Sequence, residues 1–262
     1  MLDGLVPDPE SRPRPLNHGE RTGHVLPSPS TLQLFLNELE SFSNENLMRI
    51  NYSKTCIMKF NKSRRWDFPV EIQLHANANL KVVKSTKLLG VILDSNLKWE
   101  SNTNYICKRA FSKMWLLRRM QIMGLDFTTI LDYYLKEVRS ILELAVPAWH
   151  SNLTLKLSAD IERVQRVAVG IILGTYEHPY VVSCLLLGIE PLYLRRISLC
   201  TNFAKKTALS PSSRHSDLFT QSPNPYNTRT KNIQFIEHSW NHKRFYNSPL
   251  PFLTRLLNKC NK

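Results

Sequence analysis

The chain has 262 residues, of which 42% are hydrophobic, and its 35 Lys and Arg outnumber its 21 Asp and Glu to give a formal net charge of +14. This length and apolar content predict one or two domains with a hydrophobic core, and the positive charge favours nucleic acid as partner over a merely soluble basic protein. No apolar run reaches the roughly 18 residues of a membrane-spanning helix, so no membrane association is expected.

The cysteines are scattered, odd in number and free of any CxxC spacing: Cys56, Cys107, Cys184, Cys200 and Cys260. This pattern predicts reduced thiols, with no disulfide framework and no metal site. His238 and His242 stand four residues apart, but without further ligands they indicate solvent-exposed side chains. We therefore expect an intracellular protein, in the cytoplasm or the nucleus.

The first thirty residues contain six prolines and few large apolar groups, which predicts a disordered leader over residues 1–30. From residue 31 the pattern changes to helical period. An apolar stripe predicts a helix over residues 31–43, and its members are Leu32, Phe35, Leu36, Leu39 and Phe42.

Several short apolar stretches then predict β-structure. Residues 47–51 and 56–60 are expected to be strands joined by a turn, and further strands are expected at residues 70–74, 80–83 and 88–93. The last of these contains Gly90 and is expected to be buried. Together these strands predict a small antiparallel sheet.

After residue 100 every predicted element is a helix. The apolar spacing and the flanking Gly and Pro residues predict helices over residues 106–120, 128–145, 160–173, 179–187 and 191–208. Alternating amphipathic helices with short connections indicate a helical bundle. Residues 209–262 are rich in Ser, Pro and Asn and are expected to form an irregular basic tail, so the predicted class is α+β.

Basic residues gather on one predicted face of the helix at residues 106–120, and others follow on later helices. The candidate nucleic-acid-binding residues are Lys108, Arg109, Lys113 and Arg119, with Arg163, Arg166, Arg195 and Arg196. Such a face gives sequence-blind, salt-dependent binding to phosphates. The alternatives are a solvated face, or pairing of Arg139 and Arg166 with Glu143 and Glu162. Trp115 and Trp149 have apolar neighbours at helical spacing, which places them in the core.

Three parts of the chain resemble the reverse transcriptases of non-LTR (LINE-like) retrotransposons. The motif E hairpin, or primer grip, is matched by Leu89, Gly90, Val91, Leu93, Asp94, Leu97 and Trp99. Motif D is matched by Asn51, Lys54, Thr55, Met58 and Phe60. The thumb is matched by Val138, Arg139, Ser140, Leu142, Glu143, Ala145, Pro147 and Trp149, and then by residues 161–166 with Ala168 and Gly174.

The resemblance implies the end of a polymerase palm at residues 31–100, including motifs D and E, followed by a helical thumb at residues 101–208. It also implies that Leu89 and Gly90 contact a primer, and that Lys54 is a vestigial motif D lysine. The family holds catalytic Mg²⁺ with an aspartate of motif A and a paired Asp-Asp of motif C. This chain contains no Asp-Asp, and residues 1–30 stand where motif C is expected. No cofactor is therefore expected, because Mg²⁺ would serve only the intact polymerase.

These observations support three function hypotheses. The first is an RNA-directed DNA polymerase fragment that is inactive alone and retains binding of template–primer, as RNA–DNA hybrid or duplex. The second is a structural or interaction protein, or the product of a decayed transposable element without catalytic or nucleic-acid role. The third is an enzyme completed by a partner chain that supplies the missing palm and fingers.

Overall fold

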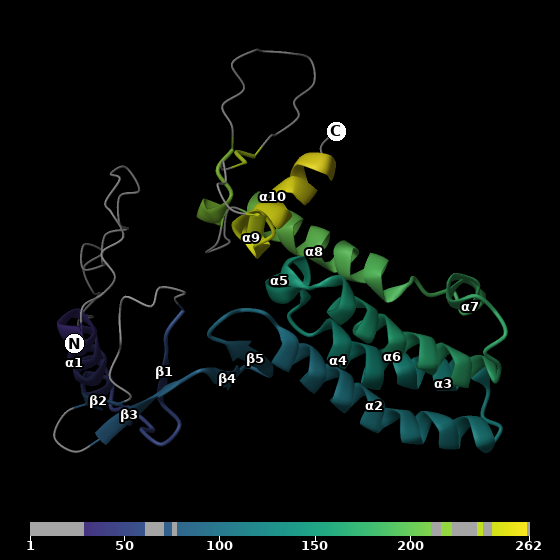
Figure 1. Cartoon of the computed structure of the whole chain (residues 1–262), viewed down its shortest axis with the longest axis horizontal. Helices are drawn as coiled ribbons and strands as arrows, with labels where there is room; N and C mark the ends of the chain where they lie inside the picture. The colour runs from purple at the N-terminus through teal and green to yellow at the C-terminus, as the bar shows by residue number, and fades with distance from the viewer. Residues whose placement is uncertain are drawn as a thin grey trace, which may run out of the picture. The chain divides into compact units, whose positions relative to one another are not determined.

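The structure is a computed structural model that describes residues 29–60, 71–74, 78–210, 216–221, 235–237 and 243–260. The chain divides into two compact units (Figure 1). Unit 1 comprises Met1–Ile57 and Arg64–Val82, and unit 2 comprises Met58–Ser63 and Val83–Lys262. Both helices and small sheets are present, so the predicted α+β class is confirmed.

The described residues of unit 1 form one helix and a three-stranded sheet with strand order β1-β3-β2. Its elements are α1 (Pro29–Glu45), β1 (Cys56–Met58), β2 (Glu71–Leu74) and β3 (Ala78–Val83). Strands β2 and β3 are antiparallel, with Ile72 opposite Leu80. A small core forms where Leu36 of α1 and Leu80 of β3 are buried.

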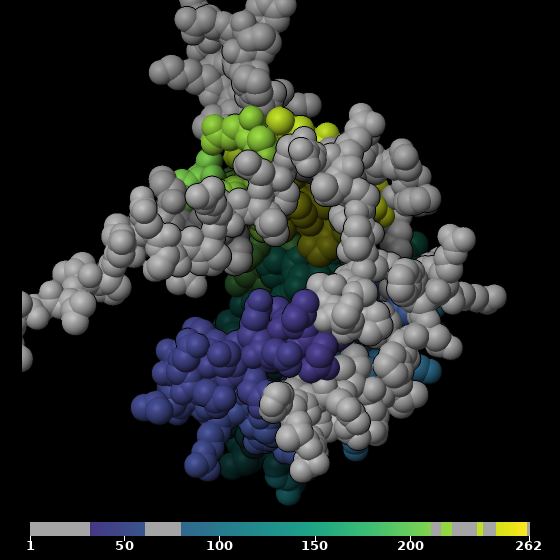
Figure 2. Space-filling model, turned by 90° about the vertical axis from the view of Figure 1, so that its left-hand side faces the viewer, coloured from purple at the N-terminus to yellow at the C-terminus, as the bar shows by residue number. Residues whose placement is uncertain are grey.

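The helix predicted over residues 31–43 and the strands predicted at 70–74 and 80–83 are confirmed in unit 1. The strand predicted at residues 47–51 is wrong. Asn46 and Leu47 form a turn after α1, in which Leu47 has a left-handed φ of 54°, and residues 48–51 form no regular strand. The apolar stripe of α1 is only partly buried, because Phe35 and Phe42 are exposed. Figure 2 shows the purple residues of this unit, which include α1, at its surface.

Unit 2 begins with an antiparallel hairpin and continues as a helical bundle. The hairpin consists of β4 (Ser85–Leu88) and β5 (Val91–Asp94). The helices of the bundle are α2 (Glu100–Ile122), α3 (Phe127–Tyr133), the π-helix η3 (Tyr134–Arg139), α4 (Ser140–Glu143), α5 (Val146–Trp149), η4 (His150–Asn152), α6 (Leu155–Leu173), α7 (Tyr180–Leu186), α8 (Leu192–Leu209), η5 (Ser216–Leu218), α9 (Lys243–Tyr246) and α10 (Pro249–Cys260). The predicted helical bundle is thus confirmed, with α7 and α8 close to their predicted bounds and α6 beginning five residues before its predicted start.

The buried strand predicted at residues 88–93 is wrong, because the chain reverses in the middle of it. Leu89 and Gly90 form the two-residue turn of the hairpin with φ values of 48° and 88°. Positive φ at both central positions is the geometry that follows the natural twist of paired strands, and glycine adopts it without strain. Leu89 is consequently 91% exposed. The hairpin packs on α2, where the Ile92 amide donates to Oδ1 of Asn102 at 3.0 Å, so it belongs with the helices and not with the sheet of unit 1.

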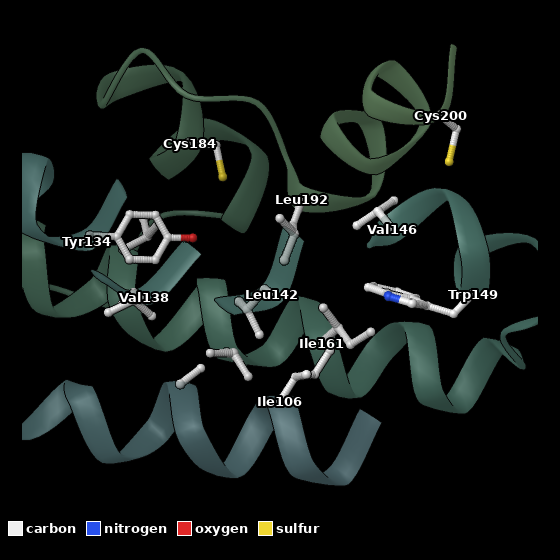
Figure 3. Packing of buried hydrophobic residues seen from close by; sticks show 14 of the residues in the cluster. Ile106, Tyr134, Val138, Leu142, Val146, Trp149, Ile161, Cys184, Leu192 and Cys200 are labelled. Atoms are coloured by element: carbon white, nitrogen blue, oxygen red, sulfur yellow. The ribbon is translucent and has the colours of Figure 1, made fainter. Parts of the chain in front are cut away.

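The core of unit 2 lies between α2, the η3–α4 segment, α5, α6 and α8 (Figure 3). Ile106 of α2 and Ile161 of α6 are fully or almost fully buried where these two helices pack side by side. Tyr134 opens the π-helical segment, and its hydroxyl donates to Oε1 of the buried Gln165 at 2.7 Å. The segment predicted as one helix over residues 128–145 therefore contains a π-helical turn, and Pro147 begins the next helix instead of ending this one.

The irregular tail predicted from residue 209 is wrong for residues 249–260, which form α10. Leu253 and Leu257 of this helix are buried against α8 and α5 in the main core. Asn258 binds the backbone of Phe235 through two hydrogen bonds of 2.9 and 3.0 Å. The C-terminal helix is therefore a structural part of unit 2, because its apolar face completes the core.

Candidate nucleic-acid interface

The outward face of α2 carries exposed basic residues. Its buried side chains recur as Ile106, Ala110, Met114 and Leu117, which fixes the inward face of the helix. Lys108 and Arg119 lie on the opposite side, Arg109 lies on the flank of the helix next to Tyr105, and all three are exposed. Among the described residues, no carboxylate forms an ion pair with these three cations. They are therefore available to phosphates.

A tyrosine holds one end of this basic face. Nζ of Lys87, from β4, donates to the hydroxyl of Tyr105 at 2.7 Å and lies 4.9 Å from the centre of its ring. The guanidinium of Arg109 lies 5.5 Å from the same ring centre. The hydrogen bond from Lys87 lowers the pKa of Tyr105, and the charge of Arg109 acts in the same direction. Lys87 was not among the predicted residues, because only the hairpin brings it to α2.

Trp115 lies on the same outward face and is 65% exposed. Its prediction as a core residue is wrong. The guanidinium of Arg119 lies 5.7 Å from the centre of its ring. Trp149, in contrast, is fully buried as predicted, and its Nε1 donates to the carbonyl of Leu144 at 2.9 Å. Trp115 stands seven residues after Lys108 and four before Arg119, a spacing that places the three on one helical face.

Lys113 lies closer to the inward side of α2 than the other basic residues. Its Nζ is 3.0 Å from Oε2 of Glu137, on the π-helical segment. The hydrogen bond to Glu137 raises the pKa of Lys113. This lysine is half-buried and already has a carboxylate partner.

Two predicted arginines lie on the exposed side of α6. Arg163 lies 5.7 Å from the ring centre of Phe111, and Arg166 lies 5.4 Å from that of Tyr180. The alternative that Arg166 pairs with Glu162 does not hold among the described residues, where the ion pair of Glu162 is with Arg196. Both arginines remain exposed cations.

Arg196 was predicted to bind nucleic acid, and this prediction is wrong. Its side chain is fully buried, with Nη2 donating to Oγ of Ser158 at 2.8 Å and to Oε1 of Glu162 at 3.2 Å. Burial lowers the pKa of Arg196. The residue stabilises the contact between α8 and α6 and has no access to a ligand outside.

Arg195 also has an internal partner. Its Nε lies 3.1 Å from Oε1 of Glu143, and Nε of Arg139 lies at the same distance from that oxygen. The pairing of Arg139 with Glu143, one of the alternatives from the sequence, is thereby confirmed. Glu143 thus holds Arg195 in an internal contact, but because this one carboxylate is shared by two guanidinium groups, a net positive charge remains.

The residues assigned from the polymerase resemblance lie in separate places. Lys54 is an exposed turn residue of unit 1, whose amide donates to Oδ1 of Asn51 at 3.2 Å. Leu89 and Gly90 form the turn of the hairpin in unit 2. A Cβ on Gly90 would lie 3.0 Å from Cδ2 of Leu144, so the glycine serves close packing as well as the turn. A contact of Leu89 or Gly90 with a primer stays a prediction.

Metal and thiol chemistry have few candidates in the described residues. Within these ranges, no cluster of three or more His, Cys, Asp or Glu is arranged to hold a metal ion. His238 and His242 lie outside the described residues. All five cysteines are free, and burial raises the pKa of Cys107 to about 11 and that of Cys200 to about 12. Both thiols are therefore protonated at neutral pH and poorly reactive.

No described helix combines the length and the apolar character needed to cross a membrane. Comparisons of this chain with protein-family models, curated proteins and solved structures find no match. Function must therefore be argued from the residues and their arrangement.

Proposed function

We propose that this chain descends from the C-terminal part of a non-LTR retrotransposon reverse transcriptase and binds nucleic acid through the outward face of α2. The observation that carries the binding proposal is the exposure of Lys108, Arg109 and Arg119 on the solvent side of α2 without an ion-paired carboxylate in the described residues. The net charge of +14 supports the same partner.

The binding would be mainly electrostatic. A cation that contacts a phosphate releases a condensed counterion, so the logarithm of the affinity falls with the logarithm of the salt concentration by about 0.9 per contact for duplex DNA. Such contacts carry no sequence information. The face on α2 is thus suited to holding a strand of any sequence, as a polymerase thumb must.

The proposed ancestry rests on the order of the resembling segments. The motif D match falls on residues 51–60, the motif E match falls on the β4–β5 hairpin, and the thumb matches fall on the helices from η3 to α6. Because the chain contains no Asp-Asp pair, we propose binding without polymerisation.

Protein interaction is a second candidate function, favoured by exposed apolar side chains on two short stretches. On α1 they are Leu34, Phe35 and Phe42, and on α7 they are Val181, Leu185 and Leu186. Clustered exposed apolar groups mark interaction sites more often than scattered ones do. This function would use surfaces other than the outward face of α2.

The test is binding of the full chain to a labelled RNA–DNA hybrid across a salt series. The variant Lys108→Gln, Arg109→Gln, Arg119→Gln removes three charges from the face. The matched control Lys156→Gln, Lys205→Gln, Lys206→Gln removes three exposed charges from α6 and α8. We expect the slope of log affinity against log salt to fall by about 3 in the first variant and to change little in the control.

Equal losses in both variants would show that binding follows total charge and not this face. An affinity no higher than that of an unrelated protein of equal net charge would contradict the nucleic-acid function altogether. Protein interaction would then be the function to pursue.

A further inference from the structure

We infer that the outward face of α2 receives a single strand of nucleic acid, with one of its bases stacked on Trp115. This inference rests on the proposed function and adds to it the form of the nucleic acid. It depends on the aromatic side chain that lies between the cations, and not on the cations alone.

Trp115 is 65% exposed on a helix whose inward face already has a full row of apolar side chains, so its indole is not used in the core. Its ring lies in no apolar cluster of unit 2. The guanidinium of Arg119 lies 5.7 Å from the ring centre. The ring is thus presented to solvent beside a cation that can bind a phosphate.

A flat aromatic ring among phosphate-binding cations is the arrangement that binds single strands. Bases stack on such rings irrespective of their sequence, while basic side chains follow the backbone. In a duplex the base faces are covered by neighbouring base pairs, so Trp115 would find no face to stack on. The charge of the face attracts any nucleic acid, but the indole gains contact area only with unstacked bases.

The spacing along α2 suits several nucleotides. From Tyr105 to Arg119 the helix rises by about 21 Å, which corresponds to about six stacked nucleotides of one strand at 3.4 Å each. Tyr105 has a different role from Trp115. Its hydroxyl and ring are in contact with Lys87 and Arg109, so it orients these cations.

The test compares two single-stranded probes of equal charge, an oligothymidylate of about 15 nucleotides and a base-free deoxyribose-phosphate strand of the same length, with an RNA–DNA hybrid as third probe. The full chain is compared with Trp115→Leu and with the control Phe203→Leu, an aromatic residue that is 44% exposed on α8. We expect the full chain and the control to bind oligothymidylate about tenfold more tightly than the base-free strand. Trp115→Leu should bind both strands equally. Oligothymidylate should also quench the tryptophan fluorescence that Trp115→Leu lacks.

Equal binding of the two single strands by the unaltered chain would overturn the stacking inference and leave phosphate binding intact. Tighter binding of the hybrid, unaffected by Trp115→Leu, would overturn it as well. If no probe is bound but the chain self-associates and Trp115→Leu prevents this, the face is a protein interface. In that outcome both the inference and the proposed function fail.

Discussion

Two regions of unit 2 use basic residues in opposite ways. On the outward face of α2, Lys108, Arg109 and Arg119 are exposed and have no ion-paired carboxylate among the described residues. Between α6 and α8, Arg196 is fully buried against Glu162. A basic residue therefore indicates a binding surface only when the neighbouring helices leave its side chain exposed. Helix α8 packs on α5, α6 and α10, and Arg196 lies on its packed side, whereas Tyr193 and Leu194 near its start are exposed.

The buried region is a network of charges and hydroxyls. The hydroxyl of Tyr180 donates to Oε2 of Glu162 at 2.6 Å, while Oε1 of the same carboxylate faces Arg196. Burial, followed by the bond to Glu162, raises the pKa of Tyr180, so this hydroxyl stays protonated as a donor. Because the network is enclosed, its members contribute to stability and not to binding.

The largest effect is expected from Arg196→Met. Removing one partner of a buried ion pair leaves the other uncompensated and costs about 3–5 kcal/mol of unfolding free energy. We expect about 3 kcal/mol, at the lower end of that range, because Nε and Nη1 of Arg196 have no partner among the described residues and Tyr180 still binds Glu162. Urea unfolding followed by circular dichroism measures this loss.

Two further variants sharpen this result. Arg163→Met removes an exposed arginine from α6 and should cost less than about 0.5 kcal/mol. The double variant Arg196→Met, Glu162→Met removes both charges and should recover most of the loss. Equal costs for Arg196→Met and Arg163→Met would contradict the division between buried and exposed basic residues.

A smaller effect is expected from acid, through His150 at the edge of the same region. Burial, and then the charge of Arg196, lowers the pKa of His150 to about 4. The folded pKa lies below the unfolded value of about 6.5, so the unfolded chain binds more protons between these two values. The unfolding free energy therefore decreases as the pH is lowered through that window. From about pH 7.5 to about pH 5 we expect this group to lose at most about 2 kcal/mol of unfolding free energy.

The measurement is urea unfolding at both pH values. His150→Phe removes the titration while keeping an aromatic ring beside Phe252, whose ring centre is 5.6 Å from that of His150. It should therefore reduce the dependence on pH, whereas His178→Gln, at an exposed position, should leave it unchanged. If His150→Phe retains the full dependence, His150 is not the group that titrates.

The fold was predictable where local pattern determines it. The apolar spacing of α6 and the closing Gly174, which has a φ of 69°, correctly predicted the end of that helix, although it begins at Leu155, five residues before the predicted start. The hairpin turn at Leu89 was missed because this residue is apolar and stands in an apolar run. Such a run is typical of a buried strand, and nothing in it indicates that one member is exposed in a turn. Helix α10 was missed for another reason. Its apolar face is short and surrounded by turn-forming residues, and only contacts with α8 and α5 reveal its role in the core.

The candidate site shows the same limit. On α2 the spacing of the buried residues predicts which cations face outward, and applied strictly it also places Trp115 outward, with Lys108 and Arg119. On α8 the sequence does not predict whether Arg196 faces inward or outward, because polar and apolar residues occur on all sides of that helix. The helices that pack on α8 determine which side is buried. Lys87 joins the face only through the pairing of β4 with β5, which brings distant residues together.

The smallest effect is expected at Lys113. This residue is on α2 like the exposed cations, but it has a carboxylate partner as Arg196 does. Its partner Glu137 is exposed, so Lys113→Ala should leave the urea midpoint unchanged within error, as is usual for surface pairs. Its effect on nucleic-acid affinity should also be smaller than that of Lys108→Ala, because Glu137 already neutralises its charge.

Glu137→Gln should increase the affinity for nucleic acid. It frees Lys113 and adds one cation to the face, so the affinity for an RNA–DNA hybrid should rise and the salt slope should steepen by about one. An unchanged slope would mean that the strand passes over Lys108 and Arg119 without reaching the side of α2 that faces the π-helical segment.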